Sequence, residues 1–230
     1  SGTGMHAMGI RGREGSRGME GIRGHLAGLV AIAASLALMV TGGCGDRETG
    51  EKRPADAAVG CPWQEVAASR LDPAAVAAVD RGLAARDAMF SRLLGRLGEA
   101  MASGGPAGAI DVCAEDAPGI AAEVAEEFGV RIGRTSFKLR NAANAPPAWV
   151  EPAVLARRGD PARFRSGDGT IGVLEPIMVM PTCLGCHGDA DRLAPGVAEA
   201  VAARYPEDRA TGFAAGDLRG WFWIEVPAAE

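Results

Sequence analysis

The first half of the chain carries hydrophobic residues at helical spacing. Apolar side chains recur every three or four positions over about 73–101, which predicts one long amphipathic helix. Asp72 is a suitable N-cap for this helix, and the glycines and the proline at 104–106 are expected to end it. A second helix is expected over about 107–128, with Gly129 as its C-cap.

The second half of the chain changes to the alternation that is typical of β-strands. Strands are expected over about 130–136, 177–180 and 221–226, a hairpin over 164–171, and short helices over 148–158 and 196–204. Because the helices come first and the hairpins later, the pattern predicts an α+β domain with an antiparallel sheet.

The N-terminal segment has the pattern of an export signal. Arginines precede an uncharged run at 26–40, which is too short to span a bilayer comfortably and suits a signal h-region. Small residues then lead to Cys44, as in bacterial lipoprotein signals. We expect residues 1–43 to be signal peptide and upstream sequence, 44–70 a flexible tether, and 71–230 one folded domain. A periplasmic protein anchored to the membrane by lipid on Cys44 is expected, with plain export as the alternative.

The charge of the chain argues against nucleic acid as a partner, and its rare cysteines and histidines indicate where to look for a site. The formal net charge is −5 at pH 7, and no basic cluster follows the N-terminal segment, so nucleic acid is not an expected partner. The chain has five cysteines and three histidines among 230 residues. A site where these rare residues coincide therefore carries most of the chemical information.

Such a site is present at Cys183, Cys186 and His187. Their spacing is C-x-x-C-H, the attachment signature of c-type haem. Two thiols at this spacing can bond to the two vinyl groups of one porphyrin, and the histidine that follows is left to ligate the iron. The alternatives are a disulfide, a thioredoxin-like redox pair, and a zinc site that lacks a second ligand pair. Haem c attachment also fits export, because it needs a maturation system outside the cytoplasm.

Several segments, taken in order, resemble a bacterial family of single-haem c-type domains with a PAS-like fold, the Tll-type haem proteins. The resemblance runs from about residue 71 to 226. It rests on Cys113 in the second helix, Arg134-Thr-Ser-Phe-Lys-Leu-Arg-Asn141, Glu175-Pro-Ile177, the C-x-x-C-H motif, and Tyr205-Pro-Glu-Asp-Arg-Ala-Thr-Gly212. It implies a PAS-like antiparallel sheet with flanking helices and a long N-terminal helix, and a haem used in electron transfer or in redox or gas sensing.

Few side chains are available as the axial partner of His187, because no other histidine lies beyond residue 43. The candidates are Met178, Met180, Met89, Met101, Cys61 and Cys113, besides an open site. The resemblance favours Cys113, and a thiolate ligand would lower the reduction potential of the iron. Cys113 as a small buried hydrophobe, or in a disulfide with Cys61, remains an alternative.

Four basic residues are candidates to pair with haem propionates. Arg134 and Arg140 lie in the segment that resembles the family, and Lys138 and Arg219 are further candidates. Arginine presents a planar fork that matches a carboxylate, whereas the alternative for all four is a solvated surface charge.

The sequence thus predicts an exported single-haem c-type protein that transfers electrons or senses redox state or a gas, with an unnamed redox partner protein. An electron carrier or sensor is favoured over an enzyme. A peroxidase-like haem enzyme with an exchangeable sixth ligand is one alternative. A thiol–disulfide oxidoreductase that uses Cys183 and Cys186 is the other.

Overall fold

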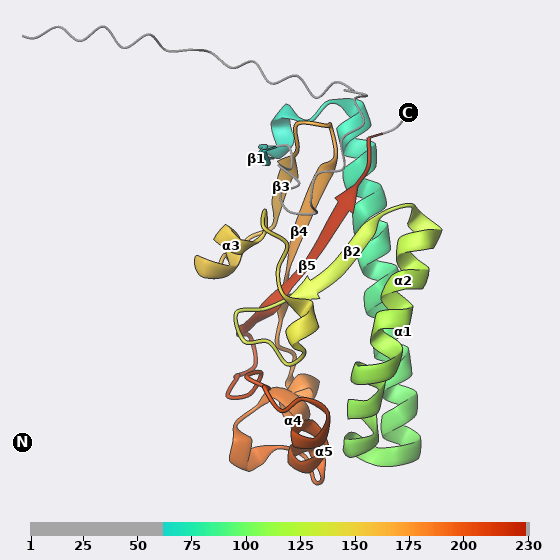
Figure 1. Cartoon of the computed structure of the whole chain (residues 1–230), viewed down its shortest axis with the longest axis vertical. Helices are drawn as coiled ribbons and strands as arrows, with labels where there is room; N and C mark the ends of the chain where they lie inside the picture. Colours follow the sequence, from blue (N-terminus) through green and yellow to red (C-terminus); the bar gives the residue numbers. More distant parts are fainter. Residues whose placement is uncertain (1–61, 229–230) are drawn as a thin grey trace, which may run out of the picture. The chain divides into compact units, whose positions relative to one another are not determined.

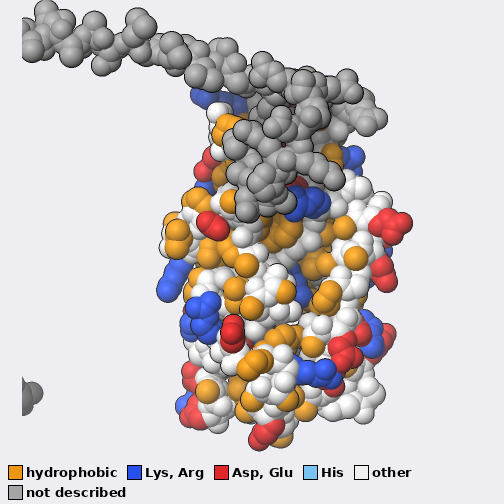
Figure 2. Space-filling model, viewed as in Figure 1, with side chains coloured by type: hydrophobic (Ala, Val, Ile, Leu, Met, Phe, Trp, Pro, Cys, Tyr) orange, Lys and Arg blue, Asp and Glu red, His pale blue; other side chains and the backbone are white. Residues whose placement is uncertain are grey.

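The computed structural model describes residues 62–228 (Figure 1). The expected signal peptide over 1–43 and the lipidation at Cys44 lie outside the described residues. Within 62–228, no helix combines the length and the hydrophobicity needed to cross a membrane. Basic and acidic side chains are interspersed over the face seen in Figure 2, so this face carries no large patch of one sign.

The centre of the fold is a five-stranded antiparallel sheet with the strand order β1-β3-β4-β5-β2. The strands are β1 Gln64–Glu65, β2 Arg131–Thr135, β3 Ala162–Arg165, β4 Ile171–Met178 and β5 Leu218–Val226. Strands β3, β4 and β5 follow one another in the sheet, whereas β2 comes from the first half of the chain and pairs with β5. The expected α+β class and PAS-like antiparallel sheet with flanking helices are confirmed.

Helices cover both faces and one end of this sheet. The α-helices are α1 Pro73–Asp111, α2 Ala117–Phe128, α3 Glu151–Leu155, α4 Leu184–His187 and α5 Val197–Arg204. A π-helical turn occupies Val112–Asp116, and 3-10 turns occupy Ala68–Arg70, Ala142–Asn144, Pro181–Cys183 and Ala190–Arg192. Helices α1 and α2 lie side by side along the sheet, α3 lies on the other side, and α4 and α5 lie near its lower end in Figure 1.

The sheet has two buried faces because its side chains alternate. On β5, Phe222 and Ile224 belong to the core cluster that includes α1 and α2. Trp221, on the opposite face of β5, belongs to a second cluster with Trp149 and other aromatic residues beside α3. Each face of β5 is therefore covered, which explains its continuous run of apolar residues.

The first long helix, α1, continues to Asp111, beyond the end at 104–106 that the sequence pattern predicts. The backbone breaks at Gly105, where φ is 68° and ψ is −174°, so the expected interruption at 104–106 is present. Helix then resumes and passes through the π turn into α2. Pro118 in the first turn of α2 has no N–H to donate, which favours an altered hydrogen-bond pattern just before it. Gly129 ends α2 in the left-handed conformation, as expected.

The folded domain begins earlier than the expected boundary at residue 71. Gln64 and Glu65 pair with β3, and the ring of Trp63 stacks on Trp149 with 4.8 Å between centroids. Glu65 also forms an ion pair with Arg158 at 2.8 Å. Residues 62–70 thus belong to the domain rather than to a tether, and a strand of two residues is too short to show a periodicity in the sequence.

Replacing Gly133 by alanine is expected to lower the free energy of unfolding by about 1–3 kcal/mol, measured by chemical denaturation. A Cβ at Gly133 would lie 2.4 Å from the ring of Trp223, its cross-strand neighbour. Gly95→Ala in α1 is the matched control, because a Cβ there meets no atom within 4 Å. The control is expected to gain ~0.5–1 kcal/mol from helix propensity. Equal stability of the two variants would contradict this account of Gly133.

Candidate functional site

A cavity of about 170 Å³ lies where β2, β4 and the π turn approach the C-x-x-C-H segment. Its lining brings together seven candidate residues from the sequence, from four separate parts of the chain: Cys113, Arg134, Arg140, Met178, Cys183, His187 and Arg219. Tyr205 also lines it, and none of the described lining residues is acidic. Cys186 lies beside it, packed against a cluster that contains Tyr205.

The C-x-x-C-H segment forms a short helical stretch that starts soon after β4 ends. Cys183 ends a 3-10 turn, and Cys186 and His187 follow within α4. Cys183 and His187 both line the cavity, as expected for residues four apart on a helical turn. Cys183 packs near Val179 and Phe213, whereas Cys186 packs near Val197 and Tyr205. The thiols of Cys183, Cys186 and Cys113 are all free.

His187 is fixed in one tautomer by a backbone acceptor. Its Nδ1 lies 2.8 Å from the carbonyl oxygen of Ala210. A carbonyl can only accept a hydrogen bond, so Nδ1 carries the proton and Nε2 keeps its lone pair. Burial, and then the nearby Arg219 and Arg140, lower the pKa of His187 to about 3. The imidazole is therefore neutral at pH 7, which is the form that binds metals.

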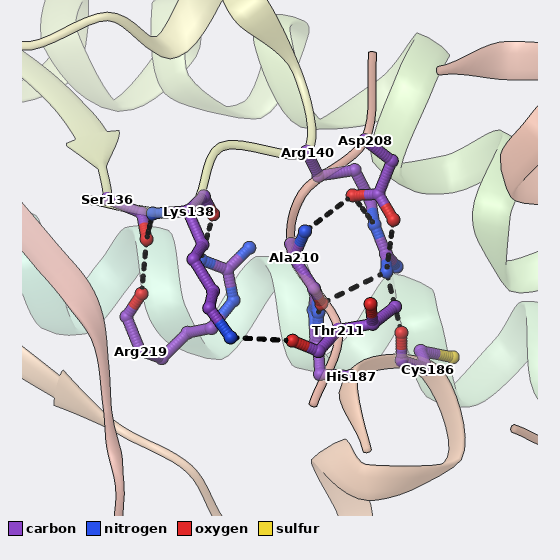
Figure 3. Close-up of polar contacts among 9 residues, drawn as sticks. All are labelled: Ser136, Lys138, Arg140, Cys186, His187, Asp208, Ala210, Thr211 and Arg219. Atoms are coloured by element: carbon purple, nitrogen blue, oxygen red, sulfur yellow. Dashed lines mark hydrogen bonds and ion pairs between the residues drawn. The ribbon is translucent and has the colours of Figure 1, made fainter. Parts of the chain in front are cut away.

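Arg140 lies next to the motif and has its polar partners within the protein (Figure 3). Its Nε donates to Asp208 at 3.1 Å, and its Nη2 donates to the carbonyl of Cys186 at 2.6 Å. The side chains of Arg140 and Asp208 are only 7% and 10% exposed. Its guanidinium thus holds the turn of the motif and pairs with a carboxylate of the chain. Because Arg140 also lines the cavity, its pairing with a propionate stays a prediction.

Of the other three basic candidates, two donate hydrogen bonds to main-chain carbonyls and one has no side-chain partner among residues 62–228. The Nζ of Lys138 donates to the carbonyl of Thr211 at 3.0 Å, and Arg219 donates to the carbonyl of Lys138 at 3.2 Å. The side chain of Arg134 has no hydrogen bond or ion pair within residues 62–228, although its backbone pairs with β5. Burial lowers the pKa of Arg134. Burial also lowers the pKa of Arg219 to about 10, so Arg219 remains charged at pH 7. The cavity is thus rich in positive charge, which suits an anionic group.

The chain is similar to known proteins both in sequence and in structure. The sequence matches the Tll0287-like family (Tll0287) over residues 59–227. The chain belongs to the Tll0287-like family. The resemblance expected from the sequence is thereby confirmed. The crystal structure of the cyanobacterial haem protein Tll0287 is similar at 24% identity, with a TM-score of 0.51, and the match covers 70% of this chain and 99% of that chain. No curated protein matches the sequence.

In this Tll0287-like domain, Cys113 lies on the π turn and lines the same cavity as His187. Burial raises the pKa of its thiol, while Arg134, Arg140 and Arg219 oppose the rise. A π turn inserts one residue into the helical spacing and is frequent at functional sites. The turn changes the direction in which side chains leave the helix, and here Cys113 reaches the cavity that Cys183 also lines.

The other sulfur candidates of the Tll0287-like domain lie in different surroundings. Met89 is buried in the core between α1 and the sheet. Met101 and Met180 are exposed and do not line the cavity. Met178 lines the cavity but is 47% exposed. Cys61 lies outside the described residues, so Cys113 and Met178 are the described sulfur candidates beside His187.

Two features of the site have weak or absent signals in the sequence. Asp208 reads as a turn residue, and only its position in the Tyr205–Gly212 segment of the family pattern drew attention to it. The acceptor that holds His187 is a main-chain carbonyl, and any residue type could supply it. Among the described residues, no group of three or more His, Cys, Asp or Glu is arranged to hold a metal ion, so the zinc alternative has no ligand set there.

Proposed function

We propose that this chain binds one haem, attached covalently through Cys183 and Cys186 and ligated by His187. The main support for this proposal is the chemical state of the two thiols and the imidazole of the C-x-x-C-H motif beside the cavity. Its two thiols are free, and its histidine is neutral with Nδ1 engaged and Nε2 available. The similar protein Tll0287 is named a haem protein, which supports the same reading for this member of the family.

The residues around the cavity fit a haem in charge, and the cavity would take part of it. A volume of about 170 Å³ is smaller than the roughly 300–1,000 Å³ of most ligand pockets, so it would enclose only part of a macrocycle. The remainder would lie toward the surface, where the motif is half-buried. Arg134 and Arg219 offer charged donors for the two propionates, and Arg134 is the candidate without another partner in residues 62–228.

Cys113 is proposed as the second residue, besides His187, that would hold the haem iron. It lines the same cavity from the helical layer, whereas His187 belongs to α4. When bound, haem supplies a one-electron redox centre, and an anionic thiolate ligand would lower its reduction potential. The high pKa of the free thiol means that the positive charge of the iron would be needed to stabilise the thiolate.

The function proposed from this site is electron transfer, or sensing of redox state or a gas, with a redox partner protein. A thiol–disulfide oxidoreductase is less well supported, because burial raises the pKa of the Cys186 thiol whereas reactive thiols of that class have lowered values. A peroxidase-like enzyme requires an exchangeable sixth position, which ligation by Cys113 would occupy. Covalent haem on a denaturing gel, with absorption spectra of the oxidised and reduced protein, tests the proposal.

The N-terminus is proposed to be that of a lipoprotein tethered to the membrane in the periplasm. The short uncharged run and the small residues before Cys44 support cleavage at that position. Mass spectrometry of the protein isolated from bacterial membranes is expected to find Cys44 as the first residue, carrying lipid. A different first residue, or an unmodified Cys44, would contradict lipidation and leave export unaffected.

A further inference from the structure

Arg140 connects the C-x-x-C-H motif with the acceptor that holds its histidine (Figure 3). Its Nη2 donates to the carbonyl of Cys186 at 2.6 Å and, more weakly, to the carbonyl of Ala210 at 3.4 Å. The carbonyl of Ala210 also accepts the proton of His187 Nδ1 at 2.8 Å. One buried guanidinium therefore contacts both the backbone of the motif and the oxygen that orients its imidazole.

Asp208 contacts the backbone of the same residue, Ala210, and the same guanidinium. Its Oδ1 accepts from the N–H of Ala210 at 2.9 Å and from the Nε of Arg140 at 3.1 Å. A few residues later, the N–H of Phe213 donates to the carbonyl of His187 at 3.1 Å. The segment from Asp208 to Phe213 is thus fastened along the motif, and the ion pair with Arg140 lies at its start.

We propose that Arg140 and Asp208 are positioning residues that set the reduction potential of the haem iron through His187. The inference rests on the proposed function and goes beyond it, because neither residue is proposed as a ligand. Arg140 fixes the motif and the acceptor of the histidine. Asp208 fixes Ala210 through the backbone N–H of that residue and neutralises the charge of Arg140.

The sign of the charge effect follows from the oxidation states. A positive charge beside the iron favours the ferrous state, which is the less positive one, and so raises the reduction potential. A carboxylate has the opposite effect. Because both side chains are almost removed from water, their charges are screened little by solvent and salt.

The test compares the reduction potentials of three variants of the haem-loaded protein by spectroscopic redox titration. Asp208→Asn removes the charge but keeps the shape and an oxygen that can accept from Ala210. It is expected to raise the ferrous-to-ferric ratio at least tenfold at a fixed applied potential. For a one-electron couple, a tenfold change corresponds to a rise of 59 mV in the reduction potential. Arg140→Gln leaves Asp208 unbalanced and is expected to shift the potential in the opposite direction.

Asp217→Asn is the matched control. Asp217 is exposed, lies in the same connection between α5 and β5, and accepts from the N–H of Ala214 at 2.7 Å, so the control repeats the charge change and the turn geometry. Its potential is expected to remain at the wild-type value. The inference is overturned if Asp208→Asn and Arg140→Gln both match the control, or if both lose covalent haem and so act only in assembly. Wild-type protein without covalent haem would instead overturn the proposed function.

Discussion

Alanine at both Cys183 and Cys186 is expected to abolish haem staining of the protein on a denaturing gel. Denaturation removes every noncovalent contact, so only thioether bonds from these thiols can keep haem on the chain. The double variant should therefore lose the whole signal, and each single variant should lose part or most of it. Expression must direct the protein to a compartment with a c-type maturation system, because attachment needs reduced thiols and that machinery.

Cys113→Ala is the control for this experiment. Its thiol lines the same cavity but lies on the π turn, outside the C-x-x-C-H segment. Staining of the control is expected to survive, since ligation alone does not resist denaturation. Undiminished staining of the Cys183→Ala and Cys186→Ala proteins would refute covalent attachment through the motif.

Serine at Cys113 is expected to convert the ferric iron from low spin to high spin, or to another ligand set. A thiolate is a strong axial ligand, whereas a serine hydroxyl at the same place remains neutral and binds iron weakly. Electron paramagnetic resonance of the oxidised wild-type protein should show a low-spin thiolate signature, and the Cys113→Ser protein should lack it. Covalent staining should be the same in both proteins.

Met178→Leu separates the two described sulfur candidates. Met178 also lines the cavity, but its side chain is 47% exposed, so its replacement should preserve the fold and the wild-type spectrum. A spectrum that changes in the Met178→Leu protein and not in the Cys113→Ser protein would make Met178 the ligand. In that case Cys113 would be a packing residue on the π turn.

If Cys113 is the ligand, reduction of the iron should weaken its bond. Ferrous iron is less positive and stabilises a thiolate less well, while burial raises the pKa of the thiol and favours its protonated form. Such a change at the π turn would connect the redox state of the site to the helical layer that packs on the sheet. This connection is the physical basis on which the site would serve a sensor.

Features of the chain that depend on neighbouring residues could be predicted from the sequence alone. The side chain of Asp72 accepts from the N–H of Ala75 and caps α1, and Gly129 ends α2 in the left-handed conformation. The C-x-x-C-H motif is equally local, because its chemistry follows from spacing within five residues. The order of helices and hairpins along the chain was also enough to predict the α+β class, because few architectures bury the apolar faces of both kinds of element.

Features that depend on contacts between distant segments were decided only by the tertiary structure. The cavity joins Cys113 on the π turn, Arg134 on β2 and His187 on α4, which lie far apart in the sequence. Arg140 could pair with a bound carboxylate or with one of the chain's own, and the pairing with Asp208 depends on how two loops meet. The acceptor of His187 is a main-chain oxygen, which has no sequence signature. Periodicity and spacing describe one segment at a time, whereas these contacts arise from packing of several segments against one another.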